Sequence, residues 1–128
     1  MLDIRPIEDS SFGVEVHRLD VGTLLAADTV AELVRELHEH RMLVIKDQHL
    51  DEERYLGFSR LLGRPDIHAL AYVHMPDYPE IELVGNVNEK DRERSIRNSA
   101  VYWHTEHAYE SNPVNILLFY ARKVPQVG

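Results

Sequence analysis

The segment Met42-Leu43-Val44-Ile45-Lys46-Asp47-Gln48 decides the fold, because a short apolar run stands here between two helical patterns. Residues 42–45 are rich in branched side chains and end at charged residues, which predicts a buried strand. Upstream, residues 28–40 have the period of an amphipathic helix, and Thr29 and Glu32 have the spacing of a capping box at its start. The apolar stripe of that helix is Val30, Leu33, Val34 and Leu37.

A second helix is expected directly after the strand. Asp51 can cap its first turn, and a Gly63-Arg64-Pro65 sequence ends it. One face would carry Tyr55, Phe58 and Leu62. The chain is therefore expected to place a strand between two helices.

The rest of the chain predicts short strands and loops. Residues 64–80 and 86–99 have the composition of long loops. The predicted strands are residues 4–7, 14–17, 81–84, 101–106 and 115–122. The expected class is α+β, mainly β, in a single domain that occupies residues 1–128.

Composition excludes several classes of protein. The apolar fraction is 44%, which is typical of a globular chain, and no cysteine is present for a disulfide, a thiolate metal site or a cysteine nucleophile. Fourteen basic and 22 acidic residues give a net charge of -8, so nucleic acid is a poor partner. No segment resembles a signal peptide or a membrane span, which predicts a cytoplasmic protein without a membrane partner.

The clearest chemical motif is Trp103-His104-Thr105-Glu106. In a strand, residues i and i+2 point to the same face, so His104 and Glu106 can offer an imidazole and a carboxylate to one ion. Two histidines and one carboxylate form the facial triad of non-haem iron(II) oxygenases. A His-x-Glu motif alone is also compatible with a half-exposed polar strand.

Several segments together resemble the taurine dioxygenase family, which includes the 2,4-dichlorophenoxyacetate and alkylsulfate dioxygenases. The metal-type motif 103–106 is the most specific of them. The others are Phe12–Val16, Leu19-Asp20, Leu43–Gln48, Phe58–Gly63, Tyr78–Ile81, Pro113, Ile116–Tyr120 and Pro125. Their order and spacing cover nearly the whole chain.

The resemblance implies a fold and an activity. The fold is a double-stranded β-helix (jelly-roll) with flanking helices, of which this chain would be the N-terminal part. The activity is Fe(II)- and 2-oxoglutarate-dependent hydroxylation of a small organic acid or amine by dioxygen, with release of succinate and CO2. Fe(II) would be held by His104, Glu106 and a downstream histidine. The co-substrate 2-oxoglutarate would chelate the iron and pair its far carboxylate with a downstream arginine.

Two features depart from the family pattern. The family usually has aspartate where this chain has Glu106, which keeps the charge and ligand type with one more methylene. The second departure is that neither the distal histidine nor the arginine is present up to Gly128, and the expected strand at 116–120 would be an edge that needs a cover. We therefore expect a C-terminal half elsewhere, no turnover from this chain alone, and self-association as a possible homo-oligomer.

Three further residues resemble the substrate pocket of the family: His68, Tyr72 and Asn98. The simpler interpretation of His68 is a loop histidine packed against its own turn. His107 follows the metal-type motif and, by strand alternation, should face away from Glu106.

Two other functions fit the sequence. One is a catalytically inactive, truncated or pseudoenzyme fragment with at most a binding role, favoured by the missing distal histidine and arginine. The other is a cupin-type metal-binding barrel, which would need further histidines that residues 108–128 do not contain.

Overall fold

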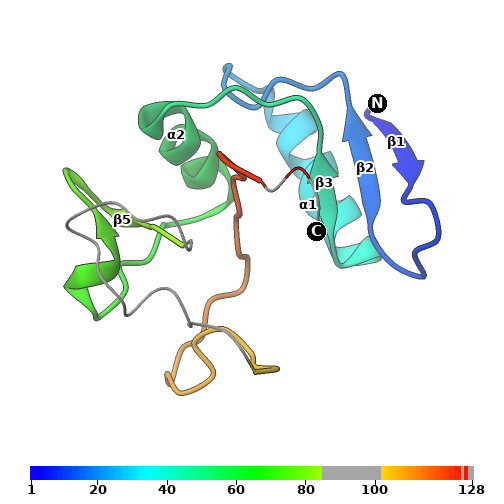
Figure 1. The fold of residues 1–128 in the computed structure, drawn as a ribbon. Helices are drawn as coiled ribbons and strands as arrows, with labels where there is room; N and C mark the ends of the chain where they lie inside the picture. Colours follow the sequence, from blue (N-terminus) through cyan, green and yellow to red (C-terminus); the bar gives the residue numbers. More distant parts are fainter. Residues whose placement is uncertain (85–101, 125, 127–128) are drawn as a thin grey trace. The chain divides into compact units, whose positions relative to one another are not determined.

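A computed structural model describes residues 1–84, 102–124 and 126, and Asn98 lies outside these residues. The chain divides into two compact units, Met1–Pro65 and Asp66–Gly128. The described part contains two α-helices, one short 3-10 helix and five strands in two sheets (Figure 1). The α+β class is confirmed.

The first unit is built on a three-stranded sheet in the order β1-β2-β3. Strand β1 (Asp3–Pro6) pairs antiparallel with β2 (Val14–His17), and β2 pairs parallel with β3 (Leu43–Ile45). Parallel neighbours need a crossover connection, which here contains helix α1. The predicted strand at 42–45 is thus confirmed with a start one residue later.

Helix α1 (Ala27–His40) agrees with the predicted period, and its Leu33 side chain is 2% exposed. The predicted capping box is wrong, because Ala26 occupies the N-cap and no side chain bonds there. Glu32 instead accepts a hydrogen bond from the Leu2 backbone N–H at 3.1 Å. This carboxylate therefore ties the start of β1 to the helix.

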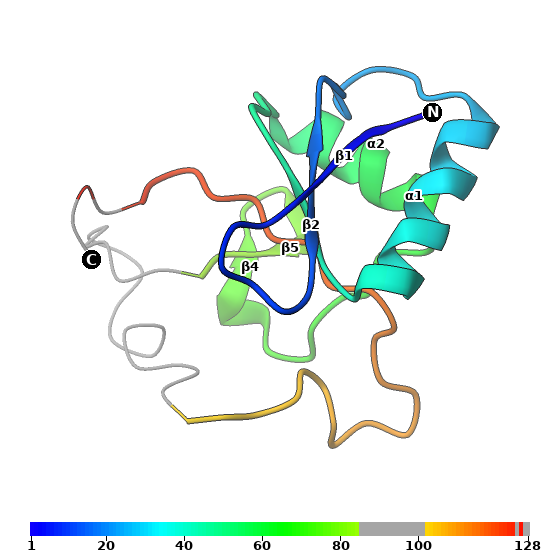
Figure 2. The same cartoon turned by 90° about the vertical axis from the view of Figure 1, so that its right-hand side faces the viewer.

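The core of the first unit lies between the sheet and its helices. Val14 and Val16 are two residues apart in β2 and are both buried, while Glu15 and His17 point to the other face. Figure 2 shows α1 along one face of the sheet. The other buried apolar residues are Val21, Leu33, Leu56 and Phe58.

Helix α2 (Glu52–Leu62) has the predicted start and end. The Asp51 carboxylate accepts a hydrogen bond from the Arg54 backbone N–H at 2.9 Å, and Gly63 is the C-cap. The buried positions are Leu56 and Phe58, so the predicted face was correct at Phe58 and missed Leu56.

Gln48 joins the end of β3 to the segment after β2. Its side-chain amide donates to the carbonyl oxygens of Leu19 and Lys46, each at 2.6 Å, and its Oε1 accepts from the Val21 N–H at 2.9 Å. This pattern fixes the orientation of the amide, because the flipped group would place an NH2 against an N–H.

The second unit contains a short hairpin. The 3-10 helix η1 (Ala71–Val73) leads into β4 (His74–Met75), which pairs antiparallel with β5 (Tyr78–Glu82). Asp77 at the turn has a φ of 68°, a left-handed conformation that Asp tolerates better than most residues. The strand predicted at 81–84 is β5, which begins at Tyr78 because the hairpin turn brings that residue into the pairing with β4.

No ladder forms in the described residues of 102–124, so the strands predicted at 101–106 and 115–122 are wrong there. Residues 106–109 form a turn, in which the Glu110 N–H donates to the His107 carbonyl at 3.0 Å. Alternation along one segment cannot specify a ladder, because the second strand of a ladder lies elsewhere in the chain.

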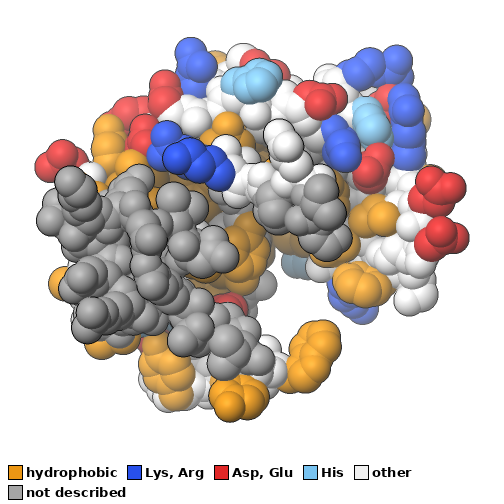
Figure 3. All heavy atoms as spheres, viewed as in Figure 1, with side chains coloured by type: hydrophobic (Ala, Val, Ile, Leu, Met, Phe, Trp, Pro, Cys, Tyr) orange, Lys and Arg blue, Asp and Glu red, His pale blue; other side chains and the backbone are white. Residues whose placement is uncertain are grey.

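The apolar side chains of this segment are largely exposed. Trp103, which the predicted strand would have packed in a sheet, is fully exposed, and Leu117 and Phe119 are 50% and 74% exposed. Residues 114, 116, 118 and 120 alternate with them as half-buried positions. Figure 3 shows apolar side chains at the surface among charged ones.

Among the described helices, neither is long and apolar enough to cross a bilayer.

Candidate metal site

The side chains of His104 and Glu106 meet, as the motif predicted, although no strand holds them. The His104 Nε2 and Glu106 Oε1 atoms are 2.9 Å apart. Both side chains are partly open to solvent, at 44% and 41% exposed. The spacing of two residues therefore brings imidazole and carboxylate together at the start of the 106–109 turn.

The Tyr102 carbonyl orients the His104 ring. His104 Nδ1 lies 2.7 Å from the Tyr102 carbonyl oxygen, which can only accept, so Nδ1 carries a proton. In the neutral ring Nε2 is then the unprotonated nitrogen, and its lone pair points to the side where Glu106 lies. Metal-bound histidines commonly donate their other N–H to a carbonyl or carboxylate in this way.

The same two contacts raise the pKa of His104 above its ordinary value. The hydrogen bond to the Tyr102 carbonyl contributes most and the hydrogen bond to Glu106 contributes next, while desolvation opposes both. Without an ion, these two contacts therefore favour the protonated His104 ring more than in an ordinary histidine.

The pair fits two adjacent ligands of one divalent ion. Ligands about 2.1 Å from an ion and at right angles to each other lie about 3.0 Å apart. The observed separation of 2.9 Å agrees with this value. Among the described residues, no third histidine or carboxylate lies within ligand reach of the pair.

His68 lies near the turn that carries Glu106. The Tyr109 hydroxyl is 3.4 Å from His68 Nε2, while His68 Nδ1 accepts from the Leu70 backbone N–H at 3.0 Å. The second contact is the loop packing expected from the simpler interpretation. Tyr72 lies in η1, and Asn98 is outside the described residues.

Sequence reasoning singled out His107 but did not predict its burial. Its side chain is 8% exposed and is the one buried polar residue in the described part of the chain. Its ring also contacts the rings of His68 and Tyr109, with centroid distances of 5.2 and 6.0 Å. Strand alternation could not predict this position, because residues 106–109 form a turn and His107 has a φ of 51°.

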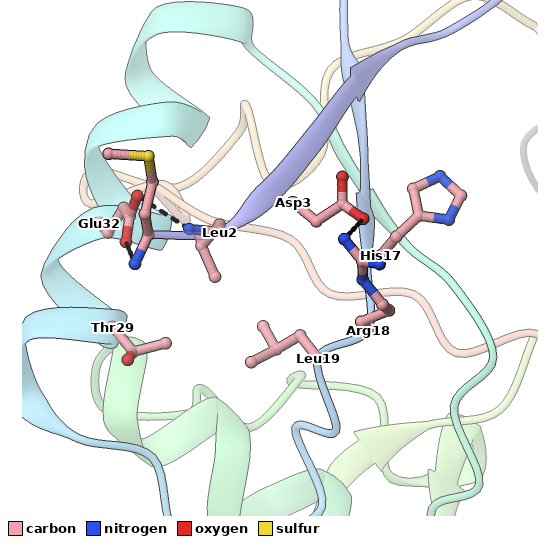
Figure 4. Close-up of a pocket in the computed structure, with 8 residues that line it drawn as sticks. Leu2, Asp3, His17, Arg18, Leu19, Thr29 and Glu32 are labelled. Atoms are coloured by element: carbon pink, nitrogen blue, oxygen red, sulfur yellow. Dashed lines mark hydrogen bonds and ion pairs between the residues drawn. The ribbon is translucent and has the colours of Figure 1, made fainter.

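A cavity of about 310 Å³ in the first unit is lined by polar groups that already pair with one another (Figure 4). On one side Arg18 pairs with Asp3 at 2.7 Å, and on the other Glu32 accepts from the Leu2 N–H. These side chains satisfy each other, so the cavity does not present a free ligand set.

Comparison with known proteins identifies the family. Residues 3–128 match the family described as "Taurine catabolism dioxygenase TauD, TfdA family". The match covers nearly the whole chain, so this chain belongs to that family and the resemblance in the sequence is confirmed.

Two curated relatives and one solved structure are similar to it. The alpha-ketoglutarate-dependent 2,4-dichlorophenoxyacetate dioxygenase of Cupriavidus pinatubonensis is 24% identical over 91% of this chain and 44% of its own length. The alpha-ketoglutarate-dependent sulfate ester dioxygenase of Pseudomonas putida is 27% identical over 82% of this chain and 32% of its own length. The chain therefore spans less than half of either relative.

The solved structure supports the fold. It is a crystal structure assigned to an alpha-ketoglutarate-dependent taurine dioxygenase of Burkholderia xenovorans. It has a TM-score of 0.57 and 24% identity, and the match covers 62% of this chain and 28% of that one. The likeness concerns the fold alone.

Proposed function

We propose that the protein containing this chain is an Fe(II)- and 2-oxoglutarate-dependent dioxygenase. It would hydroxylate a small organic acid or amine with dioxygen and release succinate and CO2. The observation that carries the proposal is the His104–Glu106 pair, whose 2.9 Å separation and ring orientation suit two ligands of one ion. Family membership and the names of the two relatives support it.

The proposal includes an architecture. Residues 1–128 would form the N-terminal portion of one dioxygenase domain with a jelly-roll fold. The third iron ligand and the arginine that binds 2-oxoglutarate would come from outside this chain. The fold likeness to a solved relative over 62% of the chain is compatible with this arrangement.

The candidate site residues of the chain each have a proposed task. His104 Nε2 and Glu106 would hold Fe(II), and the Tyr102 carbonyl would keep the His104 ring in the orientation for binding. His68, Tyr72 and Asn98 would line the substrate pocket. Bound Fe(II) with 2-oxoglutarate supplies the oxidising chemistry, and the protein positions the substrate and excludes water.

Proton release should accompany metal binding at this pair. A proton on His104 Nε2 must leave before that atom can coordinate an ion. Because the pKa of His104 is raised, acid should compete with the metal more strongly here than at an ordinary histidine.

The test uses the complete protein that contains residues 1–128. With Fe(II), 2-oxoglutarate and dioxygen, succinate release would be measured across a panel of sulfonates, alkyl sulfates, aryloxy acids, amino acids and amines. His104→Ala should lower turnover by about 100-fold or more, because a lost ligand removes several kcal/mol of metal-derived stabilisation. Glu106→Asp should keep activity, and His38→Ala, at an exposed position of α1, serves as the control.

The alternative is an inactive chain with at most a binding role. Within the described residues the His104–Glu106 pair has no third ligand, which favours this reading for the isolated chain. The isolated chain should then bind Fe(II) weakly and release no succinate. A complete protein that also binds no Fe(II) would refute the oxygenase proposal.

A further inference from the structure

The surroundings of His107 indicate a second cation site in the Asp66–Gly128 unit. Three carboxylates face its ring: Asp66 and Glu110 lie 3.9 and 3.7 Å from Nδ1, and Glu82 lies 3.8 Å from Nε2. These distances are too long for hydrogen bonds. Buried Nδ1 has no hydrogen-bond partner in the described part of the chain.

An unpaired buried nitrogen costs free energy unless something satisfies it. Here Nδ1 is aimed between two carboxylate oxygens, and the three candidate ligand atoms lie within 4.8 Å of one another. In a tetrahedral zinc site, nitrogen and oxygen ligands are about 3.4 Å apart. The Asp66 and Glu110 oxygens, at 3.9 and 3.7 Å, thus need to approach Nδ1 by about 0.5 and 0.3 Å to share an ion with it.

We propose that His107 Nδ1 and the carboxylates of Asp66 and Glu110 form a binding site for a divalent cation of the zinc type. This site is separate from the His104–Glu106 pair and does not depend on the proposed oxygenase activity. Water would complete the coordination, because Asp66 is 50% and Glu110 33% exposed.

Glu82 completes the arrangement on the other side of the ring. With Nδ1 bound to an ion, Nε2 carries the proton and points toward Glu82 at 3.8 Å. A carboxylate that accepts the second N–H of a histidine ligand fixes its tautomer and strengthens its binding. Glu82 is therefore a positioning residue of this site.

The charges also favour a cation. Within the described part of the chain, His107 is the recorded basic partner of Asp66, Glu82 and Glu110, and no lysine or arginine pairs with them. Three carboxylates around one imidazole leave a local negative excess. A divalent ion would offset it.

The opposite face of the cluster is less suitable. His68, Glu82 and His107 also lie within ligand reach of one another. However, His68 Nδ1 already accepts the Leu70 N–H, so in the neutral ring the proton is on Nε2, which lies near Tyr109. His68 has no free lone pair for an ion without losing the Leu70 contact.

A third group, Glu36, Glu39 and His40, lies on α1. Glu36 is already paired with Arg35 and His40 at 3.1 and 3.4 Å. This group carries no proposal, but an experiment has to exclude it.

The test is calorimetric titration of Zn²⁺ into the 128-residue chain carrying His40→Ala, His104→Ala and Glu106→Gln. These substitutions remove ligands from the helix group and the proposed iron pair. One Zn²⁺ per chain should still bind. In this background, Asp66→Asn and Glu110→Gln should each weaken binding at least tenfold, and Glu82→Gln should weaken it by about 10-fold.

The matched control is Asp77→Asn, which removes the same charge from an exposed turn of the same unit and tolerates the left-handed φ there. It should leave Zn²⁺ affinity within twofold. No stoichiometric binding in the background chain would overturn the proposal. Equal affinity in the background and the Asp66→Asn/Glu110→Gln double variant would also overturn it.

Discussion

Replacing Gln48 by glutamate tests whether its amide holds the first unit together. In the wild-type chain the amide donates to the Leu19 and Lys46 carbonyls and accepts from the Val21 N–H. A carboxylate can accept from Val21 but cannot donate, so it would face two carbonyl oxygens. The change keeps the size of the side chain and removes the two hydrogen bonds that the amide donates to Leu19 and Lys46.

The expected loss is about 2–4 kcal/mol of unfolding free energy at pH 7. Each lost hydrogen bond contributes about 1 kcal/mol, and a carbonyl left unsatisfied in a part-buried position adds a penalty. Gln48→Met removes these described bonds without adding charge and should cost about 2–3 kcal/mol.

The two variants differ in their dependence on pH. Carbonyl oxygens around an introduced carboxyl group raise its folded-state pKa above the unfolded value. The introduced carboxylate therefore destabilises the fold fully above its folded-state pKa, and the penalty decreases as pH falls through that pKa. The reason is that the protonated carboxyl group can again donate one hydrogen bond. The Gln48→Met penalty should not change in this way.

Urea unfolding followed by circular dichroism measures both penalties, at pH 7 and near pH 4.5. Gln126→Glu makes the same chemical change at an exposed position and should leave the midpoint unchanged. The reasoning is refuted if Gln48→Glu lies within about 0.5 kcal/mol of wild type at pH 7, which is the range of neutral surface substitutions.

Three further predictions concern the first unit. Asp51→Ala should lower unfolding free energy by about 1 kcal/mol through loss of the α2 cap, and Asp51→Ser should restore most of it in the same urea assay. Leu33→Ala should cost about 2–5 kcal/mol, because this side chain is 2% exposed, and a thermal midpoint unchanged from wild type would contradict the assignment of the core. The His17 and Lys46 contacts hold the pKa of Glu15 below its ordinary 4.5, so their contribution is complete above that pH and is lost as pH falls through the lower folded-state pKa. Glu15→Gln should therefore flatten the acid limb of the stability curve, and an unchanged limb would argue against these contacts.

The sequence predicts the first unit well because its signals are local. The 3.6-residue period of α1, the Asp51 cap and the Gly63 stop all act within one or two turns, and the structure contains each of them. The capping box failed for a tertiary reason, since Glu32 bonds the Leu2 backbone 30 residues away. A pattern of four residues has no information about that contact.

The candidate site was predicted in part. The His-x-Glu spacing predicted that His104 and Glu106 could meet, and they do, although in a turn and not in a strand. The carboxylates beside His107 include Asp66 and Glu82, which come from segments distant from it in the sequence. Contacts of that kind arise only when the chain is folded, so no spacing rule indicated them.

Strand β2 has one partner that is near in sequence and one that is distant, and this affects the order in which the chain can fold during synthesis. Its pairing with β1 is a local hairpin, whereas β3 follows only after the whole of α1. An isolated two-stranded hairpin is marginally stable in water. At about 5–20 residues per second, the ribosome delivers β3 roughly a few seconds after β2. During that interval β2 can pair with β1 but not yet with β3, and α1 is still being completed over Val14 and Val16, so this is the period when a chaperone has most to bind.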